Sequence, residues 1–367
     1  MVAAGPLASS LGLWRRRLTW WLRDPVISPI RGRIRGSMAG SGEALGPGGR
    51  ERQPGEAVLV GWARAVSRAR GAVALAGDRL KFMATRRSLE PSTLVLPALL
   101  LLLFYGAGNA YCSVVSGNTT DRRSLLDFKK AITKDPTGAL RSWNDSINYC
   151  MWLGVNCSRT HPGRVTVLNL ENLSLEGEIT PSIGSLTFLK YLDLSNNSLQ
   201  GNIPDALANC SRLTILDLSS NSLQWNIPGS LSNLGVNIMD FSNNNLTGNI
   251  PPTFSNMTQL LAISLAHNHL KGSIPEELGL LPNMVWVILR ENRLSGRVPA
   301  KLFNLSYLLV LDVRQNMLSG TLPSDIGNLL PSLQVLYLGT NKFEGHIPDS
   351  LANASLLQRL DLSSNYF

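Results

Sequence analysis

Aliphatic residues recur along the second half of the chain with a fixed spacing. The pattern L-x-L-x-x-N-x-L-x-G-x-I-P, as in Leu192–Pro204, occurs in nine copies between residues 165 and 367. The residue at its asparagine position advances by 23 to 25 residues from one copy to the next. Alternating apolar and polar residues predict a short β-strand with its leucines on one side, and one unit cannot bury them alone. The sequence therefore predicts an α/β solenoid whose strands form a curved parallel sheet on the concave face.

Each copy also carries polar and turn-forming residues at fixed places. Eight copies have an asparagine that we expect inside the turn, where its amide satisfies backbone groups of adjacent coils. These are Asn197, Asn221, Asn244, Asn268, Asn292, Asn316, Asn341 and Asn365. Glycine and proline set the turn after each strand. We expect a local distortion at Trp225, which replaces the glycine of the third copy.

A different pattern precedes the repeats, in residues 111–164. Thr120 and Asp121 are typical of a helix N-cap. Apolar residues follow at helical spacing, namely Leu125, Leu126, Phe128 and Ile132. The segment then continues into the motif C-x-W-x-G-V-x-C, which runs from Cys150 to Cys157. A helical cap at the start of the solenoid is the expected structure.

Together, the repeats and the preceding motif resemble plant leucine-rich-repeat receptor-like kinases. The overall pattern of motif and repeats is most similar to that of the pattern-recognition immune receptors of that family. The resemblance covers residues 118–367 and implies a leucine-rich-repeat solenoid with an N-terminal cap. It further implies a peptide or protein ligand and a co-receptor leucine-rich-repeat kinase. Further repeats, a membrane span and a cytoplasmic kinase belong to the resembled family and are not in this sequence, so kinase activity is not carried over.

The cysteines suit an exported protein. Cys150 and Cys157 enclose six residues, and we expect a disulfide that clamps the cap, because a metal site needs more ligands than lie nearby. Cys210 lies 24 residues after Leu186 and 24 before Leu234, which predicts a buried free thiol at a core position. The sequence leaves the state of Cys112 open.

Positive charge is concentrated at the N-terminus. Residues 1–82 hold 14 Lys and Arg against 5 Asp and Glu, a difference that equals the whole net charge of +9. Residues 111–367 hold 18 against 19 and are close to neutral, so the charge gives no reason to expect a nucleic-acid partner. No helical or strand period is sustained in residues 1–82. We expect a disordered basic extension there, or a targeting arm as the alternative.

A secretory signal peptide is predicted in residues 83–110. Arg86 and Arg87 follow Met83, an apolar run extends from Leu94 to Tyr105, and small residues end at Ala110. The run is too short for a membrane span of about 20 residues. We therefore expect a natural start at Met83, which leaves residues 1–82 untranslated, and a product that is secreted or lies on the extracellular side of the plasma membrane. An uncleaved signal anchor or a missing C-terminal span would be its membrane attachment.

Sequons for N-glycosylation are frequent. Ten occur, at Asn118, Asn144, Asn156, Asn172, Asn196, Asn209, Asn245, Asn256, Asn304 and Asn353. The signal peptide makes them candidate glycan sites, although asparagine is common in this repeat and some matches are accidental. Asn209, Asn256, Asn304 and Asn353 share one register on the outer side of the coil. Glycans on Asn172 and Asn196 would crowd the first two copies of the concave face.

Catalytic motifs are absent from the sequence. A glycine-rich loop with a downstream lysine, H-R-D and D-F-G are all missing. His267 and His269 flank Asn268, on a strand end and in a turn, and do not suggest a metal pair. We expect a protein without enzymatic activity, cofactor or metal.

Binding is expected on the concave face, where residues between the leucines are free to vary. In copies six to eight these residues change from small or polar to large, and Trp, Tyr and Arg are the types enriched in binding hot spots. The predicted ligand patch consists of Trp286, Arg290, Asp312, Arg314 and Tyr337. The alternative is an exposed charge ladder of little energetic value, beside a tryptophan packed sideways.

The most favoured function is the extracellular ligand-binding region of a plant receptor-like kinase in immune or developmental signalling. One alternative is a secreted repeat protein that inhibits a microbial wall-degrading enzyme, and another is a nonfunctional fragment of a receptor gene. Phe367 falls within the ninth copy, with no C-terminal cap before it. Because a solenoid needs such a cap, this position favours a truncated receptor over the inhibitor.

Overall fold

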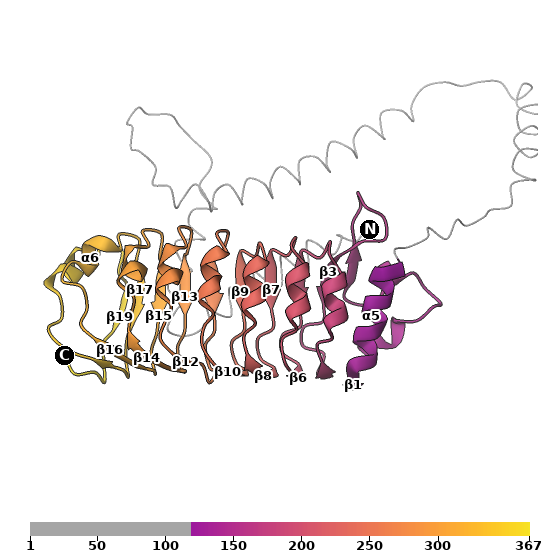
Figure 1. Cartoon of the computed structure of the whole chain (residues 1–367), viewed down its shortest axis with the longest axis horizontal. Helices are drawn as coiled ribbons and strands as arrows, with labels where there is room; N and C mark the ends of the chain where they lie inside the picture. The colour runs from indigo at the N-terminus through magenta and orange to yellow at the C-terminus, as the bar shows by residue number, and fades with distance from the viewer. Residues whose placement is uncertain (1–118) are drawn as a thin grey trace, which may run out of the picture. The chain divides into compact units, whose positions relative to one another are not determined.

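The structure is a computed structural model that describes residues 119–367. The predicted basic extension (1–82), the signal peptide (83–110), Cys112 and Asn118 lie outside the described residues. Within the described part, a cap helix is followed by stacked coils, each with a short strand on one side and a helical turn on the other (Figure 1). This is the predicted leucine-rich-repeat architecture.

The main sheet has ten strands in the order β19-β17-β15-β13-β11-β9-β7-β5-β3-β2. Their bounds are β2 Val155–Cys157, β3 Val165–Asn169, β5 Tyr191–Asp193, β7 Ile215–Asp217, β9 Ile238–Asp240, β11 Ala262–Ser264, β13 Trp286–Ile288, β15 Val310–Asp312, β17 Val335–Tyr337 and β19 Arg359–Asp361. Strands β3 to β19 are parallel, and each comes from one copy of the repeat. The cap strand β2 joins antiparallel to β3, which the repeat pattern did not predict.

A second set of strands is formed by the segments around the L-x-G positions, where the sequence predicted only turns. One sheet contains β1 Ile132–Lys134, β4 Glu176–Glu178, β6 Ser198–Gly201, β8 Ser222–Asn226 and β10 Asn245–Thr247, and a further sheet contains β12 Lys271–Gly272, β14 Arg293–Arg297, β16 Met317–Gly320 and β18 Lys342–Phe343. Strand β1 of the cap pairs antiparallel with β4. We call the outer surface of strands β4 to β18 in these two sheets the lateral face.

Short helical turns follow the proline of each copy. They are η4 Pro181–Ser185, η5 Asp205–Asn209, η6 Gly229–Asn233, η7 Pro252–Asn256, η8 Glu276–Leu280, η9 Ala300–Asn304, α6 Ile326–Leu329 and η10 Asp349–Asn353. All are 3₁₀ turns except α6, which lies in the copy with the 25-residue step. An α-turn takes more residues than a 3₁₀ turn, so the extra residue is absorbed there.

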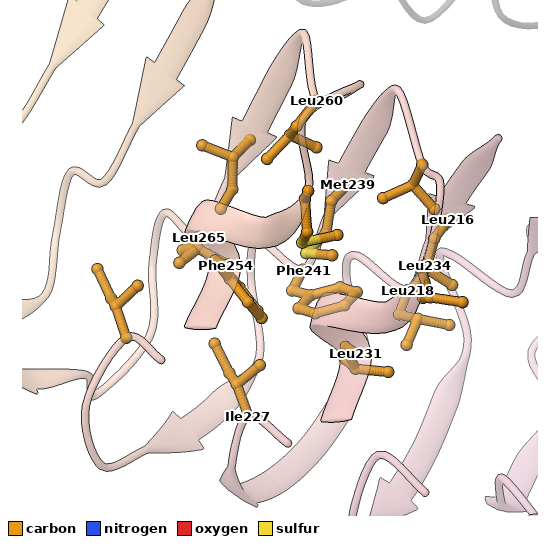
Figure 2. Packing of buried hydrophobic residues seen from close by; sticks show 14 of the residues in the cluster. Leu216, Leu218, Ile227, Leu231, Leu234, Met239, Phe241, Phe254, Leu260 and Leu265 are labelled. Atoms are coloured by element: carbon orange, nitrogen blue, oxygen red, sulfur yellow. The ribbon is translucent and has the colours of Figure 1, made fainter. Parts of the chain in front are cut away.

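The core is one continuous cluster that runs through all the coils. Leu192 and Leu194 of one copy, like Leu216 and Leu218 of the next, are completely buried. Figure 2 shows Phe241 among the leucines that fill the space between neighbouring coils. The predicted inward orientation of the leucines is confirmed.

The asparagine ladder forms as predicted. In Asn197, Oδ1 accepts from the backbone N–H of Leu175 in the preceding coil at 2.9 Å, and Nδ2 donates to the carbonyls of Leu170 and Leu194 at 2.8 and 2.9 Å. The other asparagines of the ladder repeat this arrangement as far as Asn365. Because each amide joins two coils, the ladder fixes their stacking.

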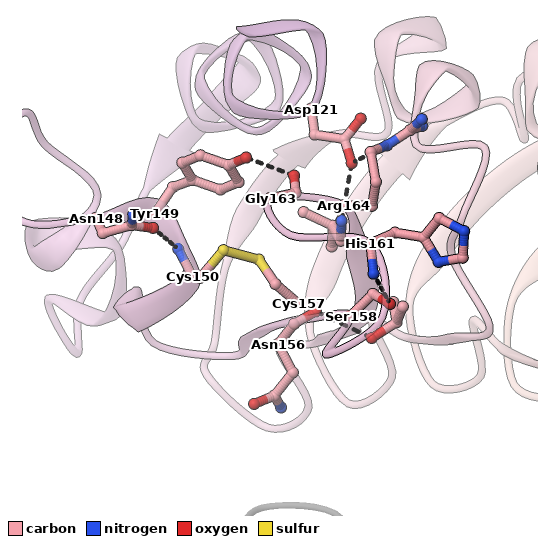
Figure 3. Close-up of a disulfide and its surroundings, with 12 residues drawn as sticks. Asp121, Asn148, Tyr149, Cys150, Asn156, Cys157, Ser158, His161, Gly163 and Arg164 are labelled. Carbon is pink, nitrogen blue, oxygen red and sulfur yellow. Dashed lines mark hydrogen bonds and ion pairs between the residues drawn. A yellow bond between two sulfur atoms is a disulfide. The ribbon is translucent and has the colours of Figure 1, made fainter. Parts of the chain in front are cut away.

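The cap is built around helix α5 (Thr119–Ala131), two short 3₁₀ turns, η2 (Ala139–Ser142) and η3 (Tyr149–Met151), and two stacked indoles. The rings of Trp143 and Trp152 lie 5.4 Å apart and are buried. Cys150 and Cys157 form the expected disulfide, with their Cα atoms 5.4 Å apart (Figure 3). It ties η3 to strand β2 and so fixes the edge that meets the first repeat.

The prediction that Thr120 and Asp121 form a helix N-cap is wrong, because both residues lie inside α5. The carboxylate of Asp121 is fully buried and turns toward the first repeat (Figure 3). Its Oδ2 accepts from the backbone N–H of Val165 at 2.8 Å and from Nε of Arg164 at 3.1 Å. Asp121 therefore anchors the cap to strand β3 instead of capping its own helix.

The expected distortion at Trp225 is also absent. Its φ is +70°, close to the +79° and +75° of Gly201 and Gly248 at the same place in neighbouring copies. The backbone thus follows the glycine path in spite of the indole.

Cys210 is a free thiol buried in the core, as predicted, and burial raises its pKa from the usual 9.0 to about 12. The folded state therefore holds this proton at a pH where the unfolded chain releases it, so stability must fall as pH rises above 9. Relative to Cys210→Ala, we expect the wild-type free energy of unfolding to drop by about 1 kcal/mol between pH 8 and pH 10. Urea unfolding of both proteins at the two pH values checks this, and a constant difference between them would contradict it.

Candidate ligand-binding face

The outer side of the main sheet carries the residues that alternate with the buried leucines. We call this surface the sheet face. It corresponds to the face that the sequence analysis described as concave. Its residues vary from copy to copy while the leucines do not, so any selectivity of the sheet must reside there.

In strands β5, β7, β9 and β19 the sheet face satisfies its own polar groups through an Asp-x-Ser pair. The carboxylate Oδ1 of Asp217 accepts from the backbone N–H of Ser219 at 3.0 Å and from its hydroxyl at 2.6 Å. The same pair forms in the other three strands: Asp193 with Ser195, Asp240 with Ser242 and Asp361 with Ser363. Each of these carboxylates thus hydrogen-bonds to a serine of its own copy. The four pairs define the regular form of the sheet face.

Tyr191 extends the network in strand β5. Its hydroxyl donates to Oδ2 of Asp193 at 2.9 Å. Burial, together with the nearby carboxylate of Asp193, raises the pKa of this phenol far above its ordinary value. Tyr191 therefore stays protonated and locked to Asp193, and belongs to the framework of the face.

The Asp-x-Ser pair is missing from strands β11 to β17. Just after strand β15, Arg314 stands where the copies of β5, β7, β9 and β19 have serine. Its Nε and Nη2 donate to Oδ1 and Oδ2 of Asp312 at 3.1 and 2.9 Å. Its guanidinium also lies 4.3 Å from the ring centroid of Tyr337 in strand β17. The structure thus brings Asp312, Arg314 and Tyr337 of the predicted patch into direct contact.

Asp312 sits in a strongly desolvated place. Burial raises the pKa of its carboxyl, while the charges of Arg314 and Arg290 and the hydrogen bonds from Arg314 act in the opposite direction. The side chain of Asp312 is only 7% exposed and that of Arg314 is 20% exposed. An exposed charge ladder, the alternative considered from the sequence, does not describe this partly buried bidentate pair.

Trp286 lies one column away from the charged residues. Its Cα is in register with Ala262 of β11 and Val310 of β15, and its side chain is half-buried. Val285 and Leu309 lie beside this column and are also half-buried. Leu261 lies at the place in the preceding copy that corresponds to Val285, and the sequence-based prediction of the patch did not include it. Its apolar character at that position was the signal that could have identified it. Together with Trp286 these residues give the patch an apolar side next to its charged side.

His267 and Glu291 occupy the far edge of the sheet face. Nδ1 of His267 lies 2.6 Å from Oε2 of Glu291, so this histidine pairs with a carboxylate on the next coil. Across residues 119–367, no three His, Cys, Asp or Glu side chains come together as a metal site would require. In the same part of the chain, no helix is both long and apolar enough to cross a membrane.

The sequons described by the structure stand on the surface, apart from the half-buried Asn156 beside the disulfide. Asn209, Asn256, Asn304 and Asn353 each end a 3₁₀ turn and are exposed, so they share one register along the helical-turn side of the coils. Asn172 and Asn196 lie at the rim of the sheet face with φ values of 57° and 54°. Glycans at these places stay a prediction.

The stacked coils and the N-terminal cap define a capped leucine-rich-repeat protein, and comparison with known families agrees with this class. Residues 118–158 match the family described as Leucine rich repeat N-terminal domain, and residues 164–223 match the one described as Leucine rich repeat. Residues 236–257, 307–329 and 332–354 match a further Leucine Rich Repeat family. The chain therefore belongs to the leucine-rich-repeat proteins that carry this N-terminal cap.

Comparison with individual proteins indicates which kind of leucine-rich-repeat protein this chain resembles. The chain is 50% identical over 70 residues to a probable LRR receptor-like serine/threonine-protein kinase of Arabidopsis thaliana, a match that covers 19% of this chain and 7% of the relative. It is 42% identical to the solved ectodomain of the Arabidopsis receptor kinase GASSHO1/SCHENGEN3 in complex with Casparian strip integrity factor 2, with a TM-score of 0.62 and coverage of 66% and 29%. A plant ice-binding protein is 31% identical, with a TM-score of 0.56 and coverage of 68% and 87%.

The described chain is thus a leucine-rich-repeat ectodomain that resembles those of plant receptor-like kinases. It spans less than a third of the length of the GASSHO1 ectodomain and about a fourteenth of the kinase relative. The match falls in the leucine-rich-repeat part of that kinase, and no kinase domain is evident in residues 119–367, the part that the structure describes.

Proposed function

We propose that residues 111–367 are the ligand-binding region of a plant receptor-like kinase of immune or developmental signalling, and that they bind a peptide or protein on the sheet face of strands β11 to β17. One observation carries the proposal: the Asp-x-Ser pairs that satisfy the regular sheet face stop at these strands. The residues at these positions include two arginines, Arg290 and Arg314, a buried carboxylate, Asp312, and one aromatic residue, Tyr337, while Trp286 lies one column away. Aromatic and arginine side chains are the usual anchors of protein recognition.

The patch suits a ligand with both apolar and polar side chains. Trp286, Val285 and Leu309 offer a half-buried apolar strip. Arg314 is held rigid by Asp312 and by its stacking on Tyr337, so it loses little side-chain freedom on binding. The GASSHO1 ectodomain, similar to this chain in sequence and fold, was solved with a bound ligand. A co-receptor leucine-rich-repeat kinase and a place on the outer side of the plasma membrane belong to the same proposal.

A displayed peptide library panned against the secreted protein tests this function. For the peptides selected on the wild type, we expect Trp286→Ala and Arg314→Ala each to weaken binding by tenfold or more, since each variant truncates a central anchor. Lys190→Ala is the control, because it removes one exposed positive charge from the sheet face outside the patch. Binding can be measured by surface plasmon resonance, and thermal unfolding shows whether each variant is folded.

Selected peptides that bind both patch variants as tightly as the wild type would overturn the proposed site. Equal weakening by Lys190→Ala would place the contact elsewhere on the sheet face and count against the patch as well.

A further inference from the structure

Trp225 is an anomaly of the lateral face. Within residues 119–367 it is the only tryptophan that is mostly exposed, with 66% of its surface open to solvent. It also takes a left-handed φ of +70°, a conformation that is unfavourable for a bulky side chain. Neither packing nor backbone geometry favours an indole there, so the stability of the fold does not account for it.

The neighbouring copies show what the position normally does. A Cβ atom added at Gly248 would lie 2.2 Å from Oδ1 of Asn226, and one added at Gly272 would lie 2.7 Å from Oδ1 of Asn249. Glycine thus leaves room for an amide side chain of the preceding coil. Trp225 occupies the same place in its copy, and Asn202 is the residue of the preceding coil that corresponds to Asn226 and Asn249.

The surroundings of Trp225 are polar and uncharged. Gln224 and Asn226 flank it in strand β8, Gln200 lies in β6 and Thr247 in β10, and all four are exposed. Among the described residues, none of the amides of Gln200, Gln224 and Asn226 makes a side-chain hydrogen bond. Each amide offers two donors and an acceptor. The place therefore combines a flat apolar ring with several unengaged amide groups.

We propose that Trp225 and the amides around it bind a neutral sugar ring. A pyranose has an apolar face of C–H groups that packs on an indole, whose π face is electron-rich. Its hydroxyls alternately donate and accept, as amide side chains do. Because no charged residue stands among these side chains, the chemistry favours a neutral sugar over an acidic one.

Two sources can supply that sugar. Asn245 begins strand β10 and is in register with Gln224, the residue next to Trp225, and it is an exposed sequon. A glycan on Asn245 would place its first N-acetylglucosamine beside the indole. A free oligosaccharide from outside would use the same ring and amides.

The test compares the secreted, glycosylated full chain with Trp225→Gly, Trp225→Phe and Asn245→Gln. Asn256→Gln is the matched control, because it removes a sequon from the 3₁₀ turn η7 and leaves the lateral face intact. The probes are chitotetraose and cellotetraose in isothermal titration calorimetry. In addition, the N-acetyl methyl signals of the glycans are followed by NMR, since ring stacking shifts them upfield.

If the sugar comes from outside, the wild type and Asn245→Gln bind one of the probes alike, and Trp225→Gly weakens that binding about tenfold or more. If the glycan of Asn245 fills the site, the wild type shows a shifted methyl signal that Trp225→Gly and Asn245→Gln abolish, while Trp225→Phe and Asn256→Gln keep it. Probe binding then appears only in Asn245→Gln.

Thermal unfolding separates a binding role from a structural one. Glycine suits the left-handed backbone better than tryptophan does. When no sugar occupies the site, we therefore expect Trp225→Gly to raise Tm by about 2 °C. The proposal is overturned if neither probe binds the wild type or Asn245→Gln and no methyl signal depends on Trp225.

Discussion

Replacing Asn268 by alanine is expected to lower the free energy of unfolding by about 3 kcal/mol, through the loss of several buried hydrogen bonds at once. Its Oδ1 accepts from the N–H of Leu246 at 3.0 Å. Its Nδ2 donates to the carbonyls of Phe241 and Leu265 at 3.0 and 3.1 Å. Alanine would leave the N–H of Leu246 unpaired inside the solenoid, where an unsatisfied buried group costs about 1–3 kcal/mol. The carbonyls of Phe241 and Leu265 would each lose one donor but keep the amide of Asn244 or Asn292.

Urea unfolding of the secreted protein, followed by circular dichroism, measures this loss. Asn233→Ala is the control, because Asn233 is an exposed asparagine at the end of η6 and makes no side-chain hydrogen bond within the described chain. Its substitution should change the free energy of unfolding by less than about 0.5 kcal/mol. Equal losses for the two variants would mean that the ladder contributes nothing beyond the loss of an asparagine side chain.

The repeat could be predicted because its signal lies in the local spacing of side chains. Leu192 and Leu194 alternate with polar residues, and that alternation alone sets which side of the strand is buried. Asn197 recurs at the same place in successive copies, so its contact with the preceding coil follows from the stacking. These features need no knowledge of residues distant in the chain.

Other features depend on pairings that side-chain spacing does not reveal. The lateral strands, such as β8 and β10, are held by backbone hydrogen bonds between coils, and the backbone carries no sequence signal for them. Asp121 binds Arg164 and Val165, which lie 43 and 44 residues away. In the sequence it looked like a cap residue, because a carboxylate near a helix start is typical of one.

For the candidate patch, residue types were predictable and contacts were not. The change of composition at Trp286, Arg314 and Tyr337 was visible in the sequence. The bidentate pairing of Arg314 with Asp312 was not, because it depends on which rotamers the neighbouring strands leave open. A sharper signal was available in the Asp-x-Ser pairs, whose interruption from β11 to β17 coincides with the patch.

The attachment of the cap to the repeats gives the second large effect. We expect Asp121→Ala to lower the free energy of unfolding by about 3 kcal/mol, because it leaves the N–H of Val165 and the guanidinium of Arg164 without their buried acceptor. The charged partner is only partly buried, with 21% of its side chain exposed, so we expect a value at the lower end for a broken buried pair. Urea unfolding again provides the measurement.

Asp127→Ala is the matched control for this variant. Asp127 lies in the same helix and pairs with Lys130, but both side chains are exposed at 37% and 77%, so its loss should cost less than about 1 kcal/mol. A double-mutant cycle of Asp121→Ala with Arg164→Ala then isolates the ion pair from the bond to Val165. A coupling energy near zero together with an undiminished loss for Asp121→Ala would assign the attachment to the backbone bond. A loss no larger than that of Asp127→Ala would show that the cap is held by its apolar contacts alone, with Leu125 and Phe128 as its main contributors.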